Sequence, residues 1–263
     1  MDLNLRGRTA LVTGASRGIG LTVARTLGAE GCHLHLAARS EEGLRAAADE
    51  IAKAYGVAVT IHPCDLSLPE PVAALGDACA EVDILVNNAG DIPTGSLQSI
   101  DSATWRRCWD LKVFGYVELT RAILPHMQAR KSGVVVNVVG VAGEMPNPNY
   151  LAGCMGNAAL IMFTEALGGD SIQHGVRVVA VNPGPTMSDR HLAHVRERAE
   201  RTLGAADRYL ELEAHNPSGR SSMVEEVADA VAFLASDRAA HISGTSICVD
   251  GGVRSHFYRA RTA

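Results

Sequence analysis

The sequence predicts an α/β protein with a doubly wound parallel sheet, and three observations carry this prediction. Short β-branched or apolar runs alternate with longer segments of helical period. The short runs are almost continuously apolar, as expected for strands that helices cover on both faces. No internal repeat, low-complexity tract or long linker divides the chain. We therefore expect one Rossmann-type domain over residues 1–263, with a seven-stranded parallel sheet.

The predicted strands are residues 9–13, 33–37, 57–61, 84–86, 134–139, 176–181 and 246–249. Between strands, apolar residues recur on one helical face, as Leu44, Ala48 and Ile51 do. After the sixth strand, a turn at Asn182-Pro-Gly-Pro precedes a charged helical stretch. Ligands bind at this edge of such sheets, so we expect about 185–220 to form a mobile lid over a bound molecule. The alternative is a solvated surface helix.

Composition excludes several classes of protein. The formal charge is −5, and the 24 Lys and Arg are scattered, which argues against a partner such as DNA or RNA. No run of 18 apolar residues and no secretory signal is present, so we expect no membrane span. The six cysteines stand singly, without metal-ligand spacing. These features predict a soluble cytoplasmic protein with reduced thiols and no metal.

A glycine-rich stretch follows the first predicted strand directly and opens a helix. Glycines at such a turn let the backbone approach a pyrophosphate, which binds the free N–H groups at the helix start. A turn that only packs the helix on the strand is the alternative. The stretch predicts a nucleotide site that includes Gly14, Ser16, Arg17, Gly18, Ile19 and Gly20.

The end of the second strand indicates which nucleotide binds. An acidic residue there would accept hydrogen bonds from a ribose 2′-hydroxyl, but this chain has Ala37-Ala38-Arg39-Ser40. Arg39, together with Arg17, would instead pair with a 2′-phosphate. We expect NADP(H) as cofactor, with NAD(H) as second choice. The alternative is that both arginines are only surface charges.

Five motifs in order resemble the short-chain dehydrogenase/reductase superfamily: the glycine stretch, Asp65, Asn87-Asn88-Ala89-Gly90, Asn182-Pro183-Gly184 and Asp250-Gly251-Gly252. The resemblance covers nearly the whole chain. It implies that Asp65 and Leu66 lie at the adenine, and that the stretch from Asn87 through Asn88 and Ala89 to Gly90 lines the adenosine ribose. It also implies that Pro183, Gly184, Thr186 and Ser188 lie toward the nicotinamide. Asn87 could instead only tie strands together, and Ser188 could only cap a helix.

The catalytic positions differ from the family pattern. The family uses a Ser-Tyr-Lys set with a supporting Asn, in which Tyr is the acid or base and Lys lowers its pKa. In a gapless register, Gly140 stands at the Ser position and Gly153 at the Tyr position. Asn157 and Lys112 then stand at the Lys and Asn positions, an apparent exchange. A rival register with gaps puts Tyr150 at the Tyr position and Cys154 at the Lys position.

We hypothesise that Tyr150 enters the space that the missing Tyr leaves and acts as the acid, with Lys112 as its electrostatic partner. Asn157 would complete the set. The alternative is that Tyr150 is only part of the pocket wall and that Lys112 binds a substrate carboxylate or the cofactor ribose. The two glycines would also enlarge the pocket beside the nicotinamide.

The sequence therefore predicts an oxidoreductase that transfers hydride between NADP(H) and a small carbonyl or alcohol substrate. One alternative is an NADP(H)-binding sensor that has lost hydride transfer, and another is an enzyme of elimination or hydrolysis on the same fold. By the resemblance, helices at about 103–130 and 157–174 would pair across two-fold axes in a homotetramer or homodimer.

Overall fold

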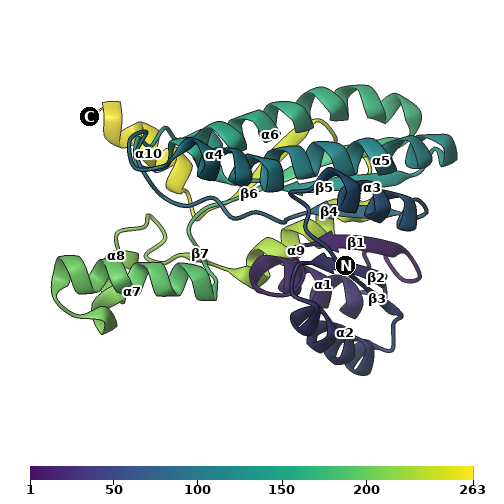
Figure 1. Ribbon diagram of the computed structural model, residues 1–263, viewed down its shortest axis with the longest axis horizontal. Coiled ribbons are helices and arrows are strands. Elements are labelled where there is room, and N and C mark those ends of the chain that lie inside the picture. The colour runs from purple at the N-terminus through teal and green to yellow at the C-terminus, as the bar shows by residue number, and fades with distance from the viewer. Residues whose placement is uncertain (263) are drawn as a thin grey trace.

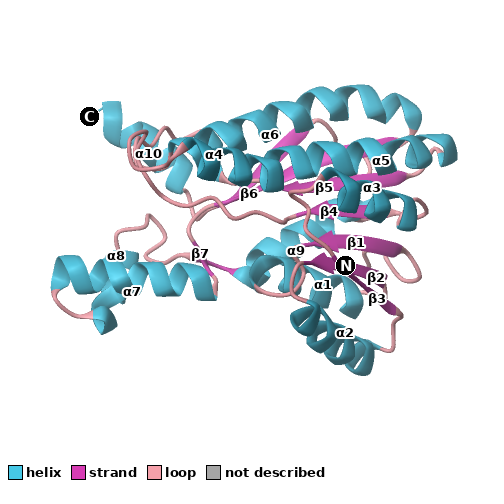
Figure 2. Cartoon of the chain, viewed as in Figure 1, coloured by secondary structure: helices cyan, strands magenta, loops and turns pink. Residues whose placement is uncertain are grey.

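The structure of the chain, a computed structural model, describes residues 1–262, with side chains described through Phe257. Its centre is a seven-stranded sheet in which every neighbouring pair is parallel, in the order β3-β2-β1-β4-β5-β6-β9 (Figure 2). The predicted seven-stranded Rossmann fold is thus confirmed. The strands are β1 Thr9–Thr13, β2 His33–Ala38, β3 Val59–Pro63, β4 Ile84–Asn87, β5 Gly133–Val138, β6 Val176–Pro183 and β9 Thr245–Val249.

Helices cover both faces of this sheet. In Figure 1, α1, α2 and α9 lie on one side of the sheet and α3, α4, α5 and α6 on the other. These helices are α1 Gly18–Ala29, α2 Glu41–Tyr55, α3 Pro69–Ala78, α4 Ser102–Trp109, α5 Gly115–Arg130, α6 Leu151–Ser171 and α9 Val224–Ala235. A last helix, α10 Val253–Thr262, ends the described chain.

Alternating strand side chains explain the two-sided core. Val12 and Val86 are fully buried in the cluster that includes residues of α1 and α9, whereas Leu11 and Leu85 are fully buried in the cluster that includes residues of α3 and α5. Because successive side chains of a strand point to opposite faces, a sheet covered on both sides needs apolar residues at every position. This requirement produces the unbroken apolar runs of the sequence.

A two-stranded parallel ladder, β7 Thr186–Met187 with β8 Ser222–Met223, marks the base of the segment after β6. Between these two strands the chain forms α7 Asp189–Leu203 and α8 Tyr209–Glu213. In Figure 1 these helices project from one end of the sheet as a separate lobe. The lobe coincides with the stretch that the sequence singled out.

One helical stretch in the described chain, Leu151–His174, is long and apolar enough to cross a membrane by length and composition. Half of its most apolar window is buried inside the molecule. Leu160 of this helix is fully buried beside Ala180 of β6. The apolar residues therefore serve the contact between α6 and the sheet, as in the core helix of a folded domain.

Candidate active site

A cavity of about 1600 Å³ opens where the parallel strands end. Residues at or just after the carboxyl ends of β1, β2, β4, β5 and β6 line it, and β1 and β4 are the neighbours between which the strand order reverses. This reversal is where open α/β sheets place their ligands. The predicted site residues on its wall are Gly14, Ser16, Arg17, Gly18, Ile19, Arg39, Leu66, Asn88, Ala89, Gly90, Lys112, Tyr150, Asn157, Pro183, Gly184, Thr186 and Ser188.

The glycine loop has the form that a pyrophosphate requires. α1 begins at Gly18, at the cavity wall, and none of the described side chains caps it. The first N–H groups of the helix therefore donate no capping bond to a side chain and are available to a ligand. Gly14 has a φ of 66°, which favours glycine, and a Cβ there would lie 2.8 Å from the Asn88 amide nitrogen. The loop therefore leaves room for an anion at an uncapped helix start.

Gly20 does not line the cavity. A Cβ on Gly20 would lie 2.4 Å from the Gly14 carbonyl oxygen and 2.4 Å from the Asn88 amide nitrogen. The Asn88 amide donates to the Thr13 carbonyl oxygen at 2.9 Å, and the Thr13 hydroxyl accepts from the backbone N–H of Asn88 at 2.8 Å. Gly20 thus lets α1 pack closely on the loop after β4, and it acts on the site through this packing.

Two further residues from the family motifs are turned away from the cavity or buried beneath it. Asp65 does not line the cavity; its carboxylate accepts hydrogen bonds from the backbone and hydroxyl of Ser67. Burial raises the pKa of Asp65, but the Ser67 bonds and the nearby Arg39 charge outweigh it and hold the pKa low. Asn87 is 1% exposed and donates to Thr120 and Asn137, so it joins β4 to α5 and β5.

Lys112 lies in a π-helical turn, Asp110–Phe114, between α4 and α5. Such turns are uncommon and recur at functional sites. The Lys112 ammonium donates to the Val139 carbonyl oxygen at 2.8 Å, and its aliphatic part passes over Gly90, where a Cβ would lie 2.9 Å from the lysine Cδ. Burial, followed by the charge of Arg190, lowers the pKa of Lys112 to about 8. The cavity wall thus includes an ammonium held in place by the strand beside it.

Tyr150 stands at the N-terminus of α6, and its ring covers Gly153 one turn further along. A Cβ on Gly153 would lie 2.1 Å from two atoms of the Tyr150 ring. Tyr150 therefore occupies the space that a side chain at position 153 would fill, and it lines the cavity. Burial raises the pKa of the phenol, whereas the charge of Arg190 lowers it.

Asn157 lies one turn beyond Gly153 and is 3% exposed. Its Oδ1 is buried and has no hydrogen-bond partner among the described residues. A Cβ on Gly140, whose φ is 143°, would lie 3.0 Å from the Asn157 amide nitrogen. The buried amide thus sits against Gly140 at the cavity wall with an acceptor left over, a state that costs stability unless a ligand satisfies it.

Sequence reasoning did not identify Arg190, which lines the cavity from the start of α7. Its guanidinium pairs with the Asp91 carboxylate at 2.8 Å and donates to the Ile92 carbonyl oxygen at 3.0 Å. The charge of Arg190 lowers the pKa of the Tyr150 phenol. The hypothesis that Lys112 is the electrostatic partner of Tyr150 stays a prediction. The position of Arg190 two residues after the predicted Ser188 was the only available signal.

The segment after β7 is fixed by two sets of hydrogen bonds. Ser188 caps α7 by accepting from the His191 backbone N–H, and it also lines the cavity. The His191 Nε2 lies 3.1 Å from both the Glu213 carboxylate and the Ser221 hydroxyl. Glu213, which is 5% exposed, also accepts from the Ser221 backbone N–H at 2.8 Å.

Comparison with known proteins agrees with this geometry. The profile of the short chain dehydrogenases matches residues 8–199. The chain is 33% identical over 252 residues to the 3-oxoacyl-[acyl-carrier-protein] reductase FabG of Escherichia coli K12, which covers 95% of this chain and 99% of that protein. The chain belongs to the short chain dehydrogenase family.

Two solved structures share the fold. The L-sorbose reductase of Gluconobacter frateurii, complexed with NADPH and L-sorbose, superposes with a TM-score of 0.91 and 31% identity over 97% of this chain and 99% of that one. An actinorhodin polyketide ketoreductase with NADPH superposes with a TM-score of 0.88 and 31% identity over 94% and 97%. The similarity therefore extends beyond the profile match, through α7 and α8 to the C-terminal region.

Proposed function

We propose that this protein is an NADP(H)-dependent oxidoreductase that interconverts a carbonyl and an alcohol, with Tyr150 as the proton donor to the substrate oxygen. As a member of its family, the chain is an NAD(P)-dependent oxidoreductase acting on CH–OH or C=O groups. The observation that carries the role of Tyr150 is its ring, which fills the space over Gly153 at the cavity wall.

The cavity suits NADPH. The uncapped start of α1 would hold the pyrophosphate, and Arg17 and Arg39, both exposed on the cavity wall, would pair with the 2′-phosphate. Leu66, Asn88 and the chain after β6 would hold the adenosine and nicotinamide parts. Solved relatives with NADPH support this choice over NADH. When bound, NADPH supplies the hydride.

Tyr150 carries out the proton transfer that reduction requires. Since burial raises its pKa, the phenol is protonated at neutral pH and is a donor to a carbonyl oxygen. Arg190 opposes the rise and favours the phenolate that forms when the proton leaves. Lys112, held by the Val139 carbonyl, adds a second positive charge at the wall. Asn157, on the same wall, would complete the set.

The domain acts as one unit over residues 1–263, and about 185–220 act as its lid. The support for the lid is the β7–β8 ladder at its base and the contact of Arg190 and His191 with the cavity. The protein would work in the cytoplasm as a homodimer or homotetramer. Large exposed side chains on the predicted pairing helices, Phe114 and Met162 at 51% and 63% exposure, support self-association.

The test follows NADPH absorbance with a panel of ketoses and 3-oxoacyl thioesters, the substrate types that the relatives' names indicate. Wild-type protein should oxidise NADPH with at least one member. Tyr150→Phe should lower this turnover on the order of 100-fold or more while NADPH affinity is retained. Tyr55→Phe, an exposed tyrosine at the end of α2, is the matched control.

Two outcomes would contradict the proposal. If the protein binds NADPH but oxidises it with no carbonyl compound of the panel, the result would favour a nucleotide sensor. Full activity in Tyr150→Phe would show that the phenol takes no part in proton transfer. Tyr150 would then only form part of the cavity wall.

A further inference from the structure

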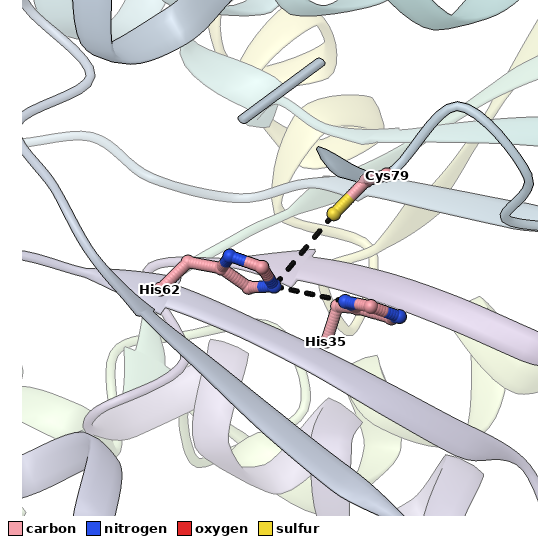
Figure 3. Close-up of side chains that lie close together, drawn as sticks. All are labelled: His35, His62 and Cys79. Atoms are coloured by element: carbon pink, nitrogen blue, oxygen red, sulfur yellow. Dashed lines mark hydrogen bonds between the residues drawn. The ribbon is translucent and has the colours of Figure 1, made fainter. Parts of the chain in front are cut away.

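Three potential metal ligands meet on one face of the sheet (Figure 3). His35 on β2 and His62 on β3 belong to neighbouring strands, and Cys79 follows the end of α3. His35 pairs with Thr60, and His62 pairs with Ala37. The two histidines are therefore offset by two residues along the ladder, which places them on the same face of the sheet. The three ligand atoms all lie within 4.8 Å of one another.

The contacts converge on one nitrogen. The Nε2 of His62 lies 2.8 Å from the Nδ1 of His35 and 3.8 Å from the Sγ of Cys79, as the dashed lines of Figure 3 show. A neutral imidazole nitrogen has either one proton or one lone pair, so it forms only one of these two contacts well. A cation between the three atoms would satisfy all of them at once.

We propose that His35, His62 and Cys79 form a binding site for a divalent transition metal ion of the Zn²⁺ type. Zn²⁺ binds imidazole nitrogen at about 2.0–2.1 Å and thiolate at about 2.3 Å with tetrahedral angles, which separates two nitrogens by about 3.3 Å and nitrogen from sulfur by about 3.6 Å. The His62 to Cys79 separation of 3.8 Å is already close to this value. The two imidazole nitrogens are 2.8 Å apart and need to separate by about half an ångström. The rings, whose centroids are 5.1 Å apart, must also turn so that both lone pairs point at the ion.

The surroundings fit such a site. Cys79 is 1% exposed, whereas both histidines are partly exposed, so an ion has a route of entry. Burial lowers the pKa of both imidazoles, which keeps them in the neutral form that binds metals. Burial also raises the pKa of the Cys79 thiol to about 12. Zn²⁺ binding would therefore release the thiol proton to solvent and form the Zn–S bond, with water as fourth ligand.

The site would join three elements, β2, β3 and the end of α3. β3 is the edge strand of the sheet, and Cys79 directly follows α3, which packs against α5. A bound ion would fix β3 to β2 and to α3. Since an ion that binds the folded form alone adds stability by mass action, Zn²⁺ should raise the thermal unfolding midpoint.

Titration of the chelator-treated protein with Co²⁺ tests the proposal, because Co²⁺ in a tetrahedral site with a thiolate gives visible d–d bands and a near-ultraviolet charge-transfer band. Wild-type protein should show both, and Zn²⁺ should displace them. Cys79→Ser should lose the charge-transfer band, and His62→Gln should weaken Co²⁺ binding about 10-fold or more. Cys32→Ser, a buried thiol that donates to the Leu5 carbonyl, and His126→Gln, an exposed histidine on α5, are the controls and should leave both bands unchanged.

A second measurement covers variants that fold poorly. Zn²⁺ should raise the thermal midpoint of wild-type protein and of Cys32→Ser but not that of Cys79→Ser, each compared with its own metal-free form. The proposal fails if Co²⁺ gives no charge-transfer band, or if Cys79→Ser and His62→Gln bind Co²⁺ and respond to Zn²⁺ as wild type does.

Discussion

The ring of Tyr150 stands where a side chain on Gly153 would have to be, with two ring atoms 2.1 Å from the position of a Cβ. The two residues are three apart at the start of α6, so they share one face of the helix. An aromatic residue at position 150 in this orientation therefore requires glycine at position 153. Gly153 thus leaves the space that the Tyr150 ring fills.

Gly153→Ala should displace Tyr150. Alanine favours the helix by about 1 kcal/mol, but its Cβ cannot coexist with the ring in its present place. We expect turnover of the panel substrate to fall on the order of 100-fold, as for loss of the acid, with NADPH affinity retained. Gly169→Ala on the same helix meets nothing within 4 Å and should keep full activity. Unchanged turnover in Gly153→Ala would show that the position of the ring does not matter.

Arg39→Ala should change cofactor preference. A charge-assisted bond to the 2′-phosphate contributes about 1.5 kcal/mol or more, so NADPH affinity should fall about 10-fold or more while NADH affinity stays constant. Fluorescence titration with both nucleotides measures this. Arg45→Ala, which loses only an exposed pair with Glu41, is the control. An equal loss for both nucleotides would contradict a role at the 2′-phosphate.

Lys112 should make stability depend on pH. Its pKa is lowered from 10.5 to about 8 in the folded protein, chiefly by burial, so between these pH values the unfolded chain binds more protons than the folded one. The free energy of unfolding therefore gains a contribution that rises from pH 8 to pH 10.5, at most about 3 kcal/mol. Lys112→Met lacks this contribution.

Denaturant unfolding of wild type and Lys112→Met across this range tests the prediction. The comparison is needed because buried thiols and phenols titrate in overlapping ranges and oppose the trend in both proteins. Stability of wild type relative to Lys112→Met should increase with pH. A constant difference would mean that the ammonium is not held away from water.

Glu213→Ala should loosen the segment that contains α7 and α8. The carboxylate accepts from the Ser221 backbone and contacts His191, and its loss would leave a buried N–H without its partner, at a cost of about 1–3 kcal/mol. Hydrogen exchange should speed up in α7 and α8 but not in the strands. Glu211→Ala removes only an exposed pair with Arg208 and should leave exchange near Glu213 as it is. Exchange that rises throughout the sheet would indicate general destabilisation instead.

The fold was predictable because its determinants are local and repeated. Each signal lies within a short stretch of sequence: the continuous apolar strands, the helical periods between them and the glycines at the first turn. The same holds for most of the cofactor wall, since the residues after the carboxyl ends of parallel strands meet at one edge. Gly20 and Asp65 are the exceptions, because motif position does not reveal whether a residue faces the cavity or supports its wall.

The remaining features arise from contacts between residues far apart in the chain. Arg190 and Asp91 meet because the start of α7 lies against the loop after β4, and no spacing in the sequence encodes that distance. His35, His62 and Cys79 were single residues without metal-ligand spacing. Strand pairing brings the two histidines together, and the end of α3 adds Cys79.

The sequence by itself determined the doubly wound fold, the family and the nucleotide loop, because these depend on periodicity and on short motifs. Only the tertiary structure decided that Tyr150 covers Gly153, that the charge of Arg190 acts on this phenol, and that two histidines and a cysteine converge on the sheet. The physical reason is that burial, charge and ligand geometry depend on distances across elements, which the packing of helices on the sheet sets.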